Sequence, residues 1–167
     1  VMFASVNDNS TGGRVYVVYG KTSNTAVEAS ELLAGSTKGF VLTGPNAGQS
    51  LMGASISAAG DVNGDGYADL IFGTPGFDAT TGIDAGAAYV VFGKAENANI
   101  AMTALGSDGF LINGATTSDY AGFSVSNAGD VNGDGLSDVI VGARNSTSFA
   151  GRSYVVFGKD TQTTVQL

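Results

Sequence analysis

The sequence contains no cysteine, no histidine and no tryptophan. These absences exclude a cysteine nucleophile, a histidine general base, a serine–histidine–aspartate triad and a zinc site of the usual cysteine–histidine kind. A chain without cysteine forms no disulfides, so the count leaves the cellular compartment open. We therefore expect none of these catalytic or zinc-binding groups in this protein.

Basic residues are also scarce, with 7 Lys and Arg against 15 Asp and Glu, which gives a formal charge of −8. Nucleic acid phosphates and anionic membrane surfaces both call for a basic patch, so neither is an expected partner. No apolar run approaches the roughly 20 residues that cross a bilayer, and we expect no membrane insertion. No signal peptide is visible in the opening residues VMFASV.

The chain has 167 residues, of which 26 are glycine. Hydrophobic residues make up 43% of the chain. Many of the apolar residues stand in short valine-rich runs, which is not the profile of a disordered polar chain. The length is sufficient for one domain with a buried core.

An internal repeat organises the chain. The nine residues DVNGDGYAD that begin at Asp61 return as DVNGDGLSD at Asp130. An apolar run follows each copy, and the run YVVFGK at residues 89–94 returns at 154–159 and, as YVVYGK, at 16–21. The two loops begin 69 residues apart, and a sequence period of this length indicates an array of similar structural units.

Each unit is predicted to contain four short strands. One precedes the aspartate loop, one follows it, the third is the YVVF run, and the fourth is typified by GFLING at 109–114 and GFVLTG at 39–44. Because YVVF is apolar at successive positions, we expect this strand to be covered on both faces. Residues 25–33 and 97–105 can each hold a helical turn between strands.

Aligning the units gives the expected domain organisation. Residues 1–50 form the end of a first unit with three strands, 51–120 a complete unit with its loop, and 121–167 a third unit with a loop but without its last strand. The first residues, VMFAS, align with the strand that follows each loop. We therefore expect the chain to be a piece of a longer array, cut within a unit at both ends.

The repeated loop is short and rich in oxygen ligands, which suits a hard cation. Its side chains can converge only if the backbone curls tightly, so we expect positive φ at Gly66 and Gly135. An EF-hand needs a bidentate glutamate at the twelfth position, where this chain has Phe72 and Val141. The EF-hand is excluded, and the aspartate at the ninth position is expected to complete the coordination.

The predicted ligands are the side chains at loop positions one, three, five and nine and the backbone carbonyl at position seven. A plain Asp/Asn/Gly turn is the alternative, but it leaves three carboxylates to repel one another. Magnesium is less suited than calcium because it keeps its waters in a strict octahedron. We expect two calcium ions with Kd of ~10⁻⁵ to 10⁻³ M. One would be held by Asp61, Asn63, Asp65, Tyr67 and Asp69, and the other by Asp130, Asn132, Asp134, Leu136 and Asp138.

These motifs resemble the FG-GAP repeats of integrin α-subunit propellers and their bacterial relatives. That family's pattern runs Phe-Gly, a short strand, a calcium loop Asp-x-Asp/Asn-x-Asp-Gly-x-x-Asp, an apolar strand and Gly-Ala-Pro. Both loops match it fully. At the flanks, Met52-Gly53 and Ala121-Gly122 replace Phe-Gly, and Gly73-Thr74-Pro75 and Gly142-Ala143-Arg144 replace Gly-Ala-Pro. The resemblance implies an all-β fold, a partial β-propeller of about two and a half blades, each with four antiparallel strands.

The resemblance further implies a non-catalytic, calcium-binding propeller segment of a secreted or cell-surface protein, with a structural, adhesion or protein-interaction role. Calcium would be structural, and its loops would lie on the face opposite the ligand-binding one. The expected partners are calcium, a protein or glycan ligand, and either the rest of the propeller or neighbouring chains at the open strand edges.

Two alternative functions stay open. The segment can belong to a propeller attached to a secreted enzyme, although no pair of acids outside the loops stands at a catalytic spacing. It can also be a carbohydrate-binding propeller that uses aromatic platforms. Core packing is the better interpretation for the aromatic residues in and beside the YVVF runs, namely Tyr16, Tyr19, Tyr89, Phe92, Tyr154 and Phe157.

Overall fold

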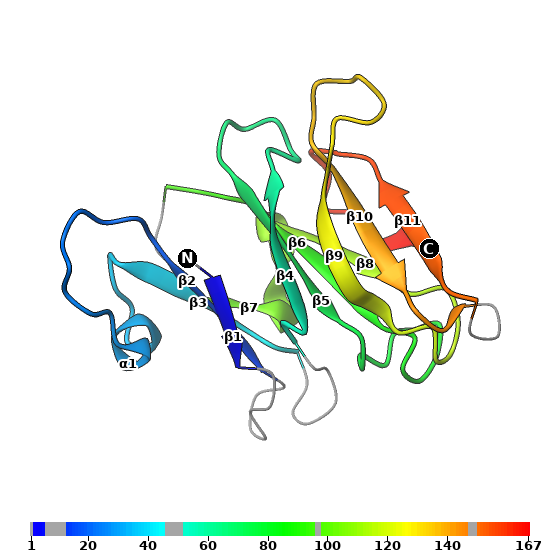
Figure 1. Ribbon diagram of the computed structural model, residues 1–167, viewed down its shortest axis with the longest axis horizontal. Helices are drawn as coiled ribbons and strands as arrows, with labels where there is room; N and C mark the ends of the chain where they lie inside the picture. Colours follow the sequence, from blue (N-terminus) through cyan, green and yellow to red (C-terminus); the bar gives the residue numbers. More distant parts are fainter. Residues whose placement is uncertain (1, 6–12, 46–51, 96–97, 147–149) are drawn as a thin grey trace.

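The computed structural model describes residues 2–5, 13–45, 52–95, 98–146 and 150–167. They form three β-sheets that follow one another in chain order (Figure 1). The all-β prediction is confirmed, since strands dominate the described residues and helix α1 (Ala29–Leu33) and the two 3₁₀ turns, Met102–Ala104 and Gly106–Asp108, are short. None of the described helices is long and apolar enough to cross a membrane. The sheets are successive blades of a partial propeller.

Within each sheet, antiparallel strands follow one another in sequence order. The first sheet contains β1 (Met2–Ser5), β2 (Arg14–Val18) and β3 (Gly39–Thr43). The second contains β4 (Ser55–Gly60), β5 (Asp69–Thr74), β6 (Ala87–Val91) and β8 (Gly109–Asn113). The third contains β9 (Ala121–Gly129), β10 (Asp138–Ala143) and β11 (Arg152–Val156). The expected unit boundary at residues 50 and 51 lies outside the described residues.

Two further strands, β7 (Ile100–Ala101) and β12 (Val165–Gln166), were not predicted. Each comes after a YVVF strand, runs back to the preceding sheet, and pairs in parallel with that sheet's fourth strand, β7 with β3 and β12 with β8. The side chain of Asn99 strengthens the first of these links, because its Oδ1 accepts the Val41 N–H at 2.8 Å. Consecutive sheets are therefore joined by hydrogen-bonded strands as well as by packing.

The connecting segments are only partly helical. Residues 25–33 contain α1, as expected. In the 97–105 segment, the described part forms β7 and a 3₁₀ turn, and residue 97 lies outside the described residues. A strand of two residues shows no hydrophobic period, which is why the sequence gives no sign of it.

The second sheet lies between the other two and carries most of the core. Val90 and Phe92 pack into a cluster shared with the third sheet, and Tyr89 and Val91 into one shared with the first. All five residues of β6 are buried, so the prediction that both faces are covered is confirmed there. The same prediction is wrong for β11, where Val155 is 44% exposed, because no described sheet packs on the far side of β11.

A glycine brings each blade close to the preceding one. Gly122 has a φ of +81°, and a Cβ at this position would lie 2.1 Å from the Ala87 carbonyl oxygen. A Cβ on Gly73 would in turn lie 1.8 Å from the Gly122 oxygen. The glycine of the Phe-Gly position is therefore required, whereas the apolar residue before it differs between the two repeats. Met52 and Ala121, which replace the phenylalanine, are both fully buried.

Candidate functional site

Each aspartate loop joins the first and second strands of a sheet, one between β4 and β5 and the other between β9 and β10. Gly66 and Gly135 have φ of +86° and +90°, as predicted for a tight curl. Gly64 and Gly133 also have positive φ, of +78° and +76°. This second left-handed position was not predicted, although Asn-Gly pairs are typical of it.

The first aspartate of the loop organises the backbone. Oδ1 of Asp61 accepts the N–H groups of Gly64 at 2.7 Å and Asp65 at 3.1 Å. Its Oδ2 accepts the Gly66 N–H at 2.9 Å. One carboxylate therefore satisfies three backbone N–H donors. These hydrogen bonds are charge-assisted, and such bonds are stronger than those between neutral groups.

The asparagine and the second aspartate are paired with each other. The Nδ2 group of Asn63 donates to Oδ2 of Asp65 at 2.8 Å, and Asn63 Oδ1 accepts the Asp65 N–H at 3.1 Å. The other carboxylate oxygen of Asp65 accepts the Tyr67 N–H at 2.8 Å. The partial positive charge of the Asn63 side-chain N–H thus lies against the Asp65 carboxylate, which is exposed to solvent.

The ninth aspartate fastens the loop to the sheet. Asp69 is fully buried, and its carboxylate accepts the N–H groups of Val62 and Gly93, each at 2.7 Å. Gly93 follows β6, so one side chain connects the start of the loop with the end of the third strand. Burial raises the pKa of the Asp69 carboxyl, although these two N–H donors oppose the shift.

The second loop repeats every one of these hydrogen bonds to within 0.1 Å. Asp130 accepts from Gly133, Asp134 and Gly135 at 2.7, 3.1 and 2.9 Å. Asn132 and Asp134 pair as in the first loop, at 2.7 and 3.0 Å, and Asp134 accepts the Leu136 N–H at 2.9 Å. Asp138 is buried and accepts from Val131 and Gly158, each at 2.8 Å. The N–H of Leu136 and the amide of Asn132 lower the pKa of the exposed Asp134 carboxyl.

The structure brings the predicted side-chain ligands together as a hydrogen-bonded network, which Tyr67 and Leu136 join through their N–H groups. Among the residues that it describes, no three acidic side chains gather closely enough to form a metal-binding group. The chemistry of the predicted ligand atoms nevertheless suits a hard cation, since all of them are oxygens. An ionised carboxylate offers about four lone pairs, and the network uses three on Asp61 and two each on Asp65 and Asp69. Lone pairs therefore remain for a cation.

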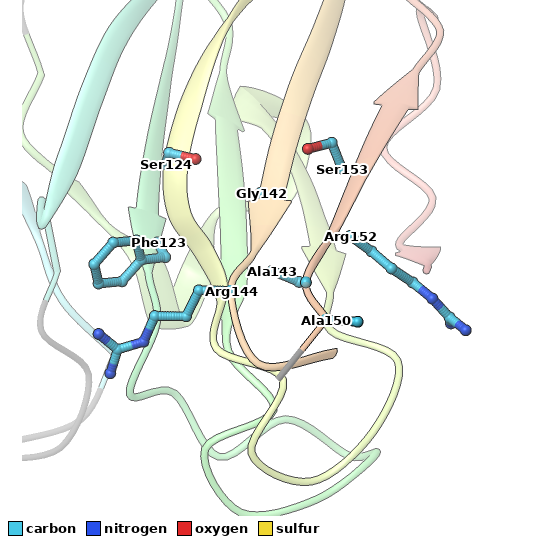
Figure 2. Close-up of a pocket in the computed structure, with 9 residues that line it drawn as sticks. Phe123, Ser124, Gly142, Ala143, Arg144, Ala150, Arg152 and Ser153 are labelled. Carbon is cyan, nitrogen blue, oxygen red and sulfur yellow. The ribbon is translucent and has the colours of Figure 1, made fainter. Parts of the chain in front are cut away.

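A second feature lies at the far end of the third sheet, where a hollow of about 370 Å³ is lined by residues including Phe123, Ser124, Gly142 and Arg144. Figure 2 shows Arg144 beside Phe123, while Arg152 extends away on the opposite side. The Arg144 guanidinium lies 4.4 Å from the Phe123 ring centroid and 4.8 Å from that of Tyr120. The two arginines diverge, so they do not form one anion site.

The FG-GAP repeat model matches the chain twice, at residues 52–91 and 121–156. Each match contains one of the aspartate loops and the strands around it. Integrin alpha-E of Mus musculus is 31% identical over 136 residues, which cover 80% of this chain and 11% of that protein. Integrin alpha-2 of Bos taurus is 34% identical over 115 residues, covering 64% of this chain and 9% of that protein.

Integrin alpha pat-2 of Caenorhabditis briggsae is 36% identical over 98 residues, which cover 59% of this chain and 8% of that protein. The chain thus spans about a tenth of the length of the curated relatives that it matches. Strand order, loop position and the blade-to-blade glycine all agree with the repeat pattern. Residues 52–91 and 121–156 are therefore two FG-GAP repeats.

Proposed function

We propose that each aspartate loop binds one calcium ion and that the chain is a non-catalytic, calcium-stabilised propeller segment. Its role would be structural, in adhesion or protein interaction, outside the cell or at its surface. The observation that carries the proposal is the agreement between the two loops. Both loops place the same set of oxygen ligands in the same hydrogen-bonded network, although they lie 69 residues apart in the chain. The similarity to integrin α chains supports the adhesion role.

The proposed ligands have separable tasks. Asp61 and Asp130 hold the loop backbone in its curl, and Asp69 and Asp138 anchor it to the residue that follows the third strand. Asn63 and Asp65, with Asn132 and Asp134, supply the exposed oxygens, and the carbonyls of Tyr67 and Leu136 complete the set. A bound calcium ion would supply the positive charge that three neighbouring carboxylates otherwise lack.

Because the anchoring aspartates reach the third strand, calcium would stabilise the whole start of a blade and not the loop alone. The proposed units are residues 1–50, 51–120 and 121–167, and the second and third each contain one such loop. The first aspartate loop is also in contact with the third unit, since the Asp61 carbonyl oxygen accepts the Ser137 N–H at 2.8 Å. Calcium bound in the first loop would therefore also stabilise a junction between blades.

Thermal unfolding with and without calcium tests the proposal. With a Kd of ~10⁻⁴ M, 1 mM calcium stabilises each loop by about 1.4 kcal/mol, which for two loops raises Tm by roughly 6 to 11 °C. Magnesium at the same concentration is the control and should raise Tm less. An equal midpoint in calcium and in chelator would contradict calcium binding.

A further inference from the structure

The chain contains three Asn-Gly pairs, and the structure places them in two different settings. Asn63-Gly64 and Asn132-Gly133 lie at the same place in the two aspartate loops, and both glycines are exposed. Asn113-Gly114 lies at the end of β8, where both residues are buried. In this dipeptide the glycine nitrogen can attack the side-chain carbonyl carbon of the asparagine, because glycine has no Cβ to hinder the approach. The dipeptide is the same in all three pairs, so the surroundings decide which of them react.

In the loops, a carboxylate holds the attacking nitrogen. The Gly64 N–H donates to Oδ1 of Asp61 at 2.7 Å, and the Gly133 N–H donates to Oδ1 of Asp130 at the same distance. A nitrogen that attacks a carbonyl carbon must give up its proton, and a general base has to lie within hydrogen-bond reach to take it. Asp61 and Asp130 already lie at that distance.

The side-chain amide of each loop asparagine is held at both of its polar atoms. Oδ1 of Asn63 accepts the Asp65 N–H at 3.1 Å, and Nδ2 of Asn63 donates to the Asp65 carboxylate at 2.8 Å. Asn132 and Asp134 form the same two hydrogen bonds, at 3.0 and 2.7 Å. Negative charge develops on Oδ1 when the glycine nitrogen attacks, and a backbone N–H that is already in place stabilises it. Each loop therefore combines a proton acceptor with an oxyanion donor.

The pair at the end of β8 lacks both of these groups. The Gly114 N–H donates to the Gly86 carbonyl oxygen at 2.9 Å, and a neutral carbonyl is a much weaker base than a carboxylate. Asn113 is 4% exposed, and within the described residues its Oδ1 has no hydrogen-bond partner. Asn113 also pairs with Ala87 and Gln166 of the two neighbouring strands, which hold it in the sheet. This third pair is therefore a control within the same chain.

We propose that Asn63 and Asn132 are self-modification sites, at which each loop converts its own asparagine to aspartate or isoaspartate. The glycine nitrogen forms a bond to Cγ of the asparagine and passes its proton to the first aspartate of the loop. The Cγ–Nδ2 bond breaks, and Nδ2 leaves as ammonia after it takes up one proton, so a succinimide ring remains. Water then opens the ring at Cγ, which gives aspartate, or at the backbone carbonyl carbon, which gives isoaspartate. No atom is oxidised or reduced.

The two products have opposite consequences for the loop. Aspartate leaves the backbone unchanged and adds one negative charge beside the three carboxylates already present. Isoaspartate adds a carbon atom to the backbone before Gly64, and all three N–H groups that Asp61 accepts lie beyond that point, so the curl is lost. Aspartate should therefore strengthen calcium binding and isoaspartate should weaken it. This consequence rests on the proposed function, whereas the conversion itself does not.

Peptide mapping by mass spectrometry of the folded chain, incubated in chelator at neutral pH, tests the inference. Conversion at Asn63 and Asn132 is expected to be at least about tenfold faster than at Asn113. In urea the three pairs should react at equal rates, because the dipeptide is the same. Asp61→Asn keeps the size of the side chain and removes the base, so it should slow conversion at Asn63 at least about fivefold and leave Asn132 unchanged. The matched variant Asp130→Asn should show the reverse.

Equal conversion at the three pairs of the folded chain would overturn the proposal, and so would a rate at Asn63 that Asp61→Asn leaves unchanged. A difference between the pairs that persists in urea would also overturn it, because the local sequence alone would then explain it. Asn113 shows whether a variant has stayed folded, since its conversion rises when β8 is exposed. All of these samples contain chelator, so an equal Tm in calcium and in chelator would contradict calcium binding and leave this inference standing.

Discussion

The two aspartate loops have the same internal structure and different surroundings. Val62, the second residue of the first loop, is fully buried, whereas its counterpart Val131 is 59% exposed. The third sheet packs over the first loop, and Ser137 donates to the Asp61 carbonyl. No described sheet packs over the second loop. The nine residues therefore specify the conformation of the loop, and the next blade supplies its burial.

The largest expected effect separates the two valines. Val62→Asp places a carboxylate in the core beside three other aspartates, which should cost about 5 kcal/mol in unfolding free energy or prevent folding. Val131→Asp changes an exposed side chain and should stay within about 0.5 kcal/mol. Urea titrations of both variants provide the measurement. Equal destabilisation would show that the second loop is covered in solution as the first is.

The next largest difference in unfolding free energy is expected between alanine substitutions of the aromatic residues that follow β6 and β11. Phe92→Ala removes a buried ring that packs against Phe110 and should cost about 3 kcal/mol. Phe157→Ala removes a half-exposed ring and should cost less than about 0.5 kcal/mol. Both changes can be measured by denaturant unfolding at one calcium concentration. A large loss from Phe157→Ala would indicate that another surface already covers this ring.

The smallest difference is expected between the loops themselves. Asp65→Ala and Asp134→Ala should each reduce the calcium count from two to one, and each should remove about 1.4 kcal/mol of the stabilisation gained in 1 mM calcium. Native mass spectrometry counts the ions, and calorimetry gives the affinity of the remaining site. Two ions still bound to either variant would refute the ligand assignment. Unequal affinities in the two variants would show that burial by the next blade tunes the site.

The sequence predicts what depends on neighbours in the chain. The strand positions, the loop hairpin and the left-handed Gly66 and Gly135 all follow from local patterns and were found in the structure. The failures concern features that depend on a neighbouring blade. Identical YVV runs give a fully buried β6 and a largely exposed β11, because burial depends on which sheet packs against each strand.

The aspartate at position nine shows a second limit. Its place before an apolar strand indicated a ligand, and the structure adds a structural task, an anchor to Gly93 or Gly158. That partner lies 24 or 20 residues further along the chain, after the third strand, so only the folded sheet brings the two together. The calcium ligands themselves stay a prediction, which the Asp65→Ala and Asp134→Ala variants decide.

The backward pairing of β7 and β12 has a consequence for how arrays of this kind change during evolution. The sequence repeat and the hydrogen-bonded sheet are out of phase, because the first and second sheets each contain a strand from the unit that follows. No single cut in the chain releases one whole sheet without severing such a pair. The segment that can be duplicated without losing these pairs is therefore the sequence repeat and not the hydrogen-bonded sheet, because each following unit brings its own backward-pairing strand.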